Sequence, residues 1–182
     1  MTQRTVNFFS EGTKMEGDLF LPADLKSGAQ RPAVVLCHGF TGVRSMILGD
    51  YAKVFADAGF IALTFDYRGY GGSEGTRRRL IPLEQIDDIR NAISFVETLP
   101  EVDPARIGLW GTSFGGANAP YAAALDARIR AVVGQVGFGD VSAFSSIPGV
   151  SANGKNCCAR LPKIAGAGRS RVPAHGWTRW TH

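Results

Sequence analysis

The sequence has no long hydrophobic run and few cysteines. No stretch of eighteen apolar residues occurs, so no segment has the character of a membrane-spanning helix. The first ten residues also lack the apolar core of a secretion signal. There are three cysteines, two of them adjacent at Cys157 and Cys158, which do not make a disulfide framework. We therefore expect a cytoplasmic protein that does not associate with membranes.

The overall composition is that of a globular domain. Hydrophobic residues make up 45% and charged residues 20% of the 182 residues. This balance excludes a disordered charged tail protein and a collagen-like chain. The length is enough for one domain with a hydrophobic core and too short for two.

Positive charge is concentrated at the end of the chain. The formal net charge is +4, yet fourteen of the twenty basic residues and all sixteen acidic residues lie within residues 1–150. The remaining six basic residues lie within 151–182. A mildly acidic body is not a surface for duplex nucleic acid, so we expect no nucleic-acid partner. The sequence leaves the oligomeric state open.

The segment 151–182 has no hydrophobic periodicity. Its only large aliphatic residues are Leu161, Ile164 and Val172, so it buries too little apolar surface to offset its ordering entropy. It could be a disordered native tail, a basic interaction tail, or sequence translated outside its proper reading frame. We favour the last interpretation, which divides the chain into an incomplete domain over 1–150 and a non-native or disordered basic tail over 151–182.

Residues up to about Phe144 alternate between strand-like and helix-like patterns. Continuous apolar runs predict strands buried on both faces, and apolar residues at intervals of three and four predict helices. Such alternation predicts an α/β fold with a mostly parallel sheet and helices on both faces. The expected buried strands are Ala33–Cys37, Phe60–Phe65, Arg106–Trp110 and Ile129–Val136. The expected helices cover 47–58, the segment between Pro82 and Pro100, and Phe114–Leu125.

Turn residues complete this outline. Glu11-Gly12 separates two further expected strands, Thr5–Ser10 and Met15–Leu21. Asp103-Pro104 predicts a turn before the third buried strand. In a parallel sheet, reactive residues gather at the carboxyl ends of the strands, so the motifs that follow each buried strand are the candidates for function.

The most specific motif is Gly111-Thr112-Ser113-Phe114-Gly115, with Gly116 after it. Between a strand and a helix, this pattern is typical of a nucleophile elbow, a strained turn that projects the serine hydroxyl. Glycines flank the serine because a side chain there would clash across the turn. The N–H groups that begin the following helix point at the same place and stabilise an oxyanion. The alternative is a purely structural role for this motif, as a glycine-rich packing turn with a surface serine.

Two other loops follow buried strands. His38-Gly39-Phe40 can direct a backbone N–H, that of Phe40, at the same oxyanion, and His38 itself is expected to order its loop rather than act as a base. The segment 65–73 has no Lys-Ser/Thr pair for a phosphate loop, so we interpret it as one wall of the site. Arg77–Arg79 is expected to be a solvated surface and Cys37 a small core residue.

Together these motifs resemble the α/β-hydrolase superfamily over about residues 5–145. Residues 102–116 are especially similar to its dienelactone-hydrolase-like and Xaa-Pro-dipeptidyl-peptidase-like branches. The resemblance implies that Ser113 is the nucleophile and that the N–H groups of Phe40 and Phe114 form the oxyanion hole. It also implies a carboxylic ester or a short peptide as substrate, with no metal and no cofactor. Dienelactone hydrolases have cysteine at the position of Ser113, which argues against that particular activity.

The sequence departs from this family after the fourth buried strand. The family continues with two strands that bring an acid and then a histidine, whereas here no acidic residue follows Asp140 and the later histidines are His175 and His182. Ser113, Asp140 and His175 stand in the order serine, acid, histidine that the family requires. However, His175 lies in a segment without a recognisable folding pattern that would hold it in place. The strand Ile129–Val136 would then be an open apolar edge.

We therefore predict an α/β-hydrolase-like sandwich that lacks its last strands, with serine hydrolase chemistry impaired by loss of the acid and the histidine. Two alternatives remain. One is a non-catalytic relative that binds a partner through the open edge or the basic tail. The other is a transferase that passes the acyl group to an acceptor other than water.

Overall fold

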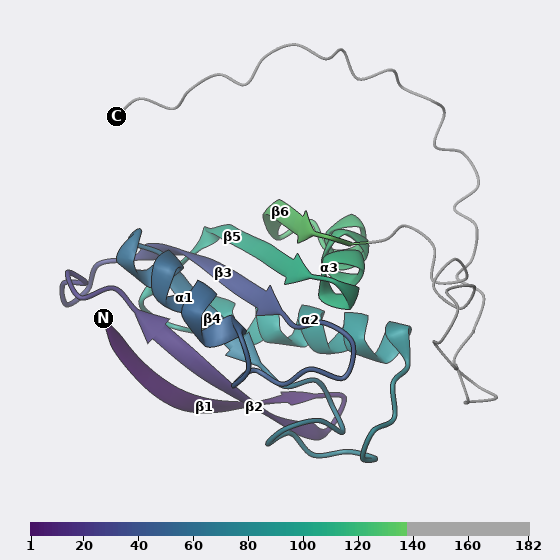
Figure 1. Ribbon diagram of the computed structural model, residues 1–182. Helices are drawn as coiled ribbons and strands as arrows, with labels where there is room; N and C mark the ends of the chain where they lie inside the picture. The colour runs from purple at the N-terminus through teal and green to yellow at the C-terminus, as the bar shows by residue number, and fades with distance from the viewer. Residues whose placement is uncertain (138–182) are drawn as a thin grey trace, which may run out of the picture.

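The structure is a computed structural model that describes residues 1–137 as one six-stranded sheet with three helices (Figure 1). The predicted domain boundary at residue 150 and the segment 151–182 lie outside the described residues. The strands are β1 (Thr2–Ser10), β2 (Thr13–Leu21), β3 (Arg31–Cys37), β4 (Ile61–Phe65), β5 (Val102–Thr112) and β6 (Ile129–Gln135). The helices are α1 (Leu48–Asp57), α2 (Pro82–Glu97) and α3 (Phe114–Leu125).

The sheet is mostly parallel, with the order β1-β2-β4-β3-β5-β6. β1 and β2 form an antiparallel hairpin, and β2 pairs antiparallel with β4. β3 lies parallel between β4 and β5, and β6 extends the parallel group beyond β5. The carboxyl ends of the four parallel strands therefore lie at one edge of the sheet, where the three sequence motifs meet. The predicted fold class is confirmed.

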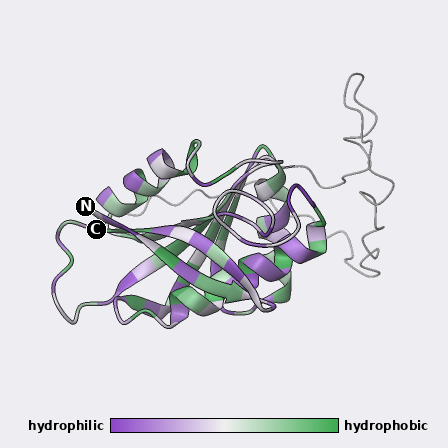
Figure 2. Ribbon diagram, turned by 90° about the horizontal axis from the view of Figure 1, so that it is seen from below, coloured by the Kyte–Doolittle hydropathy of each residue, from purple (hydrophilic) through white to green (hydrophobic). Residues whose placement is uncertain are grey.

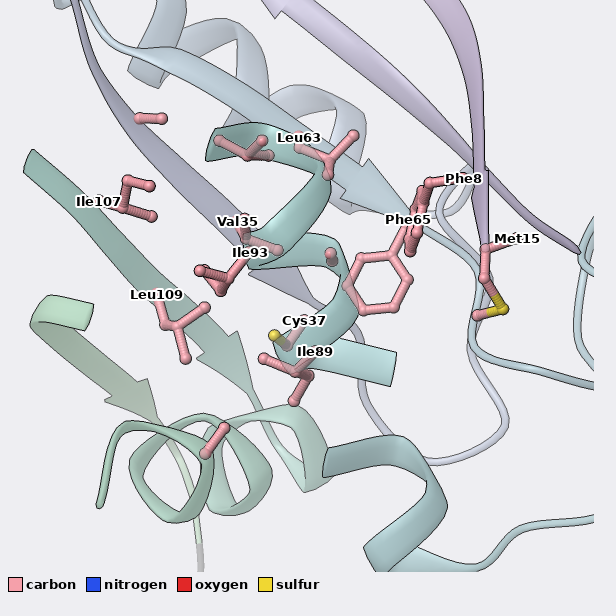
Figure 3. Packing of buried hydrophobic residues seen from close by; sticks show 14 of the residues in the cluster. Phe8, Met15, Val35, Cys37, Leu63, Phe65, Ile89, Ile93, Ile107 and Leu109 are labelled. Atoms are coloured by element: carbon pink, nitrogen blue, oxygen red, sulfur yellow. The ribbon is translucent and has the colours of Figure 1, made fainter. Parts of the chain in front are cut away.

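Helices cover both faces of the sheet (Figure 1). On one face, Leu48, Ala52 and Ala56 of α1 pack against β2, β3, β4 and β5. On the other face, α2 and α3 enclose the larger cluster, which includes Val35, Leu63, Phe65, Ile89, Ile93 and Leu109 (Figure 3). Figure 2 shows hydrophobic residues concentrated on the central strands, whereas the helices carry residues of both kinds. This is the pattern expected of strands buried on both faces between amphipathic helices.

Two local expectations were wrong. Ile129–Val136 was expected to be buried, but Val132 and Val133 are 40% and 54% exposed. The reason is that, among the described strands, β6 pairs only with β5. It is covered on one face by α3, whereas α1 packs on the opposite face of the sheet over β2, β3, β4 and β5. As the open-edge expectation requires, β6 is the last strand of the described sheet.

The second correction concerns Asp103-Pro104. These residues lie inside β5, where the pairing to β3 jumps from Arg31↔Val102 to Ala33↔Ile107. The Asp103 carboxylate accepts the N–H of Ala105 at 2.9 Å, which supports the irregular backbone of this bulge. The turn signal therefore produces a bulge within a continuous strand rather than a boundary.

Candidate active site

Ser113 occupies a strained turn between the end of β5 and the start of α3. Its backbone angles are φ 54° and ψ −120°, a region that residues other than glycine rarely adopt. Its N–H donates to the carbonyl oxygen of Gln135 at 2.9 Å, and its carbonyl accepts the N–H of Ala117 at 3.2 Å. The turn is thus held from both sides, by β6 and by the first turn of the helix. This is the backbone geometry that the sequence pattern predicted.

The glycines around Ser113 allow segments to approach closely. A Cβ at Gly115 would overlap the carbonyl oxygen of Cys37 and lie 2.6 Å from that of His38. One at Gly111 would overlap the carbonyl of Gly115, and one at Gly116 would lie 2.7 Å from the carbonyl oxygen of Gln135. The motif therefore packs β5, α3 and the end of β3 closer together than any side chain permits.

The loop after β3 lies directly against Ser113. A Cβ at Gly39 would be 3.1 Å from Cβ of Ser113 and 3.6 Å from its Oγ. The ring centroids of Phe40 and Phe114 are 6.0 Å apart in an edge-to-face contact. Phe114 is buried and begins α3, where the first N–H groups point out of the helix, while Phe40 is 49% exposed. The structure thus brings together the three predicted site residues, Ser113, Phe40 and Phe114.

His38 orders this loop. Its ring is buried, Nδ1 lies 2.9 Å from the carbonyl oxygen of Gly39, and Nε2 accepts the backbone N–H of Tyr67 at 3.4 Å. This pairing requires a neutral ring with its proton on Nδ1. Burial lowers the pKa of His38, which agrees with a neutral imidazole. His38 therefore orders its loop through a hydrogen bond, as expected from the sequence, and the structure shows that it also links this loop to the one after β4.

Replacing His38 with glutamine is expected to weaken the dependence of stability on acid. Because burial holds the pKa of His38 below its ordinary value, the unfolded chain binds more protons there, and stability falls as pH drops through the pKa of the unfolded chain. The measurement is urea unfolding at about pH 5 and about pH 7.5, on either side of the ordinary histidine pKa. An equal pH-dependent loss of stability in both proteins would contradict a neutral His38.

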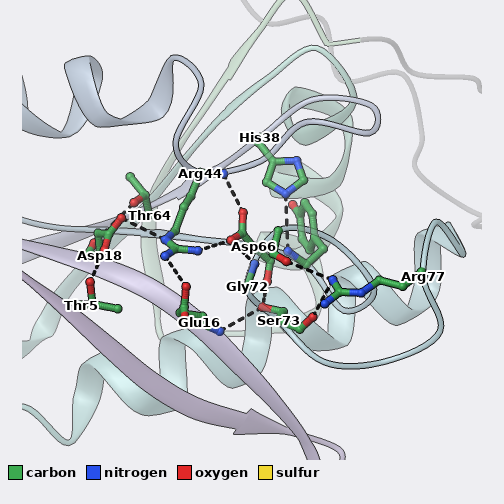
Figure 4. Close-up of polar contacts among 12 residues, drawn as sticks. Thr5, Glu16, Asp18, His38, Arg44, Thr64, Asp66, Gly72, Ser73 and Arg77 are labelled. Carbon is green, nitrogen blue, oxygen red and sulfur yellow. Dashed lines mark hydrogen bonds and ion pairs between the residues drawn. The ribbon is translucent and has the colours of Figure 1, made fainter.

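The segment 65–73 forms a polar wall beside this loop (Figure 4). Asp66 is 1% exposed and accepts the N–H groups of Arg44 at 2.7 Å and Gly72 at 3.0 Å. Ser73 Oγ donates to the Asp66 carbonyl at 2.6 Å and accepts the Glu16 N–H at 2.9 Å. The expectation that this segment is a structural wall agrees with these contacts.

Several side chains of this wall were not singled out in the sequence. Arg44 contacts the carboxylates of Glu16, Asp18 and Asp66, and Arg68 donates to the buried Asp88 of α2 at 2.6 and 2.9 Å. Arg77–Arg79 are exposed, as expected, and Arg77 also donates to the carbonyls of Gly71 and Ser73. The carboxylate partners of Arg44 and Arg68 lie 20 to 28 residues away in the chain, so no local pattern could have revealed them.

Cys37 is fully buried at the end of β3, and burial raises the pKa of its thiol to about 12. A thiol with such a pKa stays protonated and does not act as a nucleophile at neutral pH. Cys37 is therefore the small core residue that was expected.

Within residues 1–137, His38 is the only histidine, and its ring is engaged in the loop contacts described above. Asp140 and His175, the formal partners of Ser113, lie outside the described residues. An apolar cavity of about 260 Å³ lies on the α1 side, between Phe55, Phe60, Trp110 and Val133, and Ser113 does not line it. In the described part of the chain, no three acidic, histidine or cysteine side chains are grouped to hold a metal. Nor is any helix of that part long and apolar enough to cross a bilayer.

Comparison with known proteins agrees with the observed fold. The alpha/beta hydrolase fold family matches residues 32–151. Over 142 residues, the chain is 39% identical to the quorum-quenching protein AidA of Acinetobacter baumannii, covering 78% of this chain and 45% of that protein. It is 40% identical to the thiohydrolase aneE of Aspergillus aculeatus over 134 residues, covering 72% of this chain and 41% of that protein. The chain thus spans less than half the length of these relatives.

Solved structures give the same result. The α/β hydrolase GrgF of Penicillium superposes with a TM-score of 0.68 at 31% identity, covering 72% of this chain and 45% of that one. A hypothetical protein of Pseudomonas aeruginosa gives a TM-score of 0.69 at 35% identity, with 72% and 41% covered. The described sheet and helices therefore correspond to part of a larger structure in these proteins.

Proposed function

Because the chain belongs to the α/β-hydrolase fold family, we propose that it carries the nucleophile and oxyanion hole of an acyl-transfer site, with Ser113 as the nucleophile. The observation that supports this most is the strained backbone of Ser113, with φ 54° and ψ −120°, between a parallel strand and a helix. Strain of this kind is costly, about 1–3 kcal/mol, and it is typically retained where it orients a reacting group.

In the proposed reaction, Oγ of Ser113 attacks the carbonyl carbon of the substrate and gives its proton to a water molecule, because the described residues supply no side-chain base. The carbonyl oxygen becomes negatively charged and accepts the N–H groups of Phe40 and Phe114. The intermediate collapses, the leaving group departs with a proton, and water then releases the acyl group from Ser113. Phe40 lies in the loop after β3, whose Gly39 approaches Ser113, and Phe114 directly follows Ser113 as the first residue of α3.

The proposed substrate is a small carboxylic ester, thioester or short peptide. Three relatives are named thiohydrolases and two are named polyketide transferases, which supports an acyl group on sulfur or oxygen. The same names keep open an acceptor other than water, which product analysis would identify. We propose a cytoplasmic location, with no metal, cofactor, membrane or nucleic acid required.

The proposed activity is weak. The one histidine within residues 1–137 binds its own loop, so the described residues offer no base to Ser113. Oxyanion stabilisation and substrate binding alone leave about 10³–10⁴-fold catalysis over water in serine enzymes that have lost their triad. We expect turnover of activated esters within that range.

A fluorophosphonate probe tests the proposal. It reacts with a serine when a neighbouring oxyanion hole stabilises the negative charge on the phosphoryl oxygen of the probe. We expect intact mass to show one adduct and peptide mapping to place it on Ser113. Ser113→Ala should abolish the adduct, whereas the control Ser94→Ala, at a half-buried position of α2, should keep it.

Folded protein that does not react would favour the non-catalytic alternative. The strand β6 supports that alternative, because it is the edge strand of the described sheet and its Val132 and Val133 are exposed. A strand edge of this kind is a site where another chain can pair. A defined complex from cell extract, together with unreactive Ser113, would be its signature.

A further inference from the structure

Arg44 joins three segments beside the proposed site. It lies on the loop after β3, six residues beyond His38. Its guanidinium pairs with Glu16 and Asp18 of β2 and with Asp66 after β4, the Asp18 contact measuring 2.9 Å. Its backbone N–H also donates to Asp66 at 2.7 Å. The same residue thus holds the loop through both its main chain and its side chain (Figure 4).

The residues that pair with the Arg44 guanidinium are themselves held by other hydrogen bonds. Asp66 is 1% exposed and also accepts the N–H of Gly72 at 3.0 Å. Asp18 accepts the hydroxyl of Thr5 at 2.9 Å, and Glu16 donates its N–H to Ser73 Oγ at 2.9 Å. β2 is paired on both sides, by β1 and β4. Arg44 therefore attaches the loop to the rigid sheet rather than to another mobile loop.

Without Arg44 the loop would lose most of these anchors. Three carboxylates would face one another without a cation, and Asp66 would remain as a buried charge without its ion pair, which is strongly unfavourable. Two polar contacts to the rest of the protein would remain. The main-chain N–H of residue 44 would still donate to Asp66, and His38 Nε2 lies at the long distance of 3.4 Å from the Tyr67 nitrogen. The segment that contains Gly39 and Phe40 would then be held less tightly against Ser113.

We propose that Arg44 is a positioning residue, which holds the Phe40 N–H in place opposite Ser113 by fixing the loop to Glu16, Asp18 and Asp66. This inference rests on the proposed function, because it assigns Arg44 to the geometry of the same oxyanion hole. Arg44 does not touch the substrate. It acts through the loop that carries the donor.

The test compares Arg44→Met with Arg128→Met. Arg128 makes a similar set of contacts, to both carboxylate oxygens of Asp126 at 2.9 and 2.6 Å and to Glu97 at 2.9 Å. It lies just before β6, at the sheet edge opposite Ser113. Both variants lose an arginine with several carboxylate contacts, but only the first is next to the proposed site.

The readout is the rate at which the fluorophosphonate probe labels Ser113. Loss of one oxyanion donor costs about 10²–10³-fold, so Arg44→Met should slow labelling by about 100-fold while Arg128→Met stays within about twofold of the native rate. Arg44→Lys keeps the charge but not the planar fork, and should lie between the two. Equal rates for Arg44→Met and Arg128→Met would overturn the inference.

Amide hydrogen exchange gives a second readout that does not need a reactive serine. Arg44→Met should raise exchange in a peptide that spans residues 38–43, and Arg128→Met should leave it unchanged. If the native chain is not labelled but this difference is seen, the proposed function fails and the positioning role stands. If labelling is seen but exchange does not differ, the positioning role fails alone. If Arg44→Met does not fold, Arg44→Lys is compared with Arg128→Met in both the labelling and the hydrogen-exchange measurements.

Discussion

Alanine in place of Gly115 is expected to lower the free energy of unfolding by about 3 kcal/mol or more, the upper range for overpacking a buried site. The new Cβ would overlap the carbonyl oxygen of Cys37 and lie 2.6 Å from that of His38. Cys37 is the last residue of β3 and His38 follows it directly. Because β3 pairs with β4 on one side and β5 on the other, the Cys37 oxygen cannot move away. Ser113 should lose its reactivity together with the fold.

The sign of this prediction is informative because helix propensity points the other way. Gly115 lies in the first turn of α3, where alanine would otherwise gain up to about 1 kcal/mol over glycine. The clash must therefore outweigh a favourable local change. Urea unfolding of the variant measures the difference directly, with circular dichroism to report whether a cooperative transition remains.

Gly49→Ala is the matched control, because Gly49 lies in α1 with no atom within 4 Å of the new Cβ. It should stabilise the protein by up to about 1 kcal/mol, as expected for a helical glycine. A Gly115→Ala protein that is as stable as Gly49→Ala would show that the tight turn around Ser113 does not exist in solution.

The parts of the site that could be predicted are those encoded by neighbours in the sequence. Ser113 and its glycines form a local pattern, and the strain at Ser113 follows from a turn that involves only a few consecutive residues. The buried strands β3 and β4 were equally readable, because a strand covered on both faces leaves a continuous apolar run. The common edge for the loops after β3, β4 and β5 then follows from parallel pairing alone.

The parts that could not be predicted depend on tertiary partners. Arg44 contacts carboxylates 22 to 28 residues away, and no periodicity marks such pairs. The burial of β6 also depends on tertiary packing that the sequence does not show. Its apolar run indicates a strand, but whether the strand is covered depends on which elements pack beside it, so its exposure became visible only in the structure.

Replacing Ser113 by glycine is expected to stabilise the protein relative to Ser113→Ala while both variants lose labelling by the phosphonate probe. Alanine keeps the strained backbone at φ 54° and ψ −120°, which costs about 1–3 kcal/mol, whereas glycine adopts positive φ without penalty. Against this gain stands the greater conformational entropy of glycine in the unfolded chain, about 0.4–1 kcal/mol. The difference should favour the glycine variant by about 1 kcal/mol.

The same pair of substitutions at Ser94 should give the opposite order. Ser94 lies in the interior of α2, where glycine is less favourable than alanine by about 1 kcal/mol. Urea unfolding of all four variants therefore tests whether glycine or alanine is the more stable substitution at each position. The effect of glycine on the unfolded chain is similar at both positions, so it does not decide whether the order differs between them. If alanine is the more stable substitution at both positions, the backbone of Ser113 carries no strain, and the physical basis for assigning it as the nucleophile is lost.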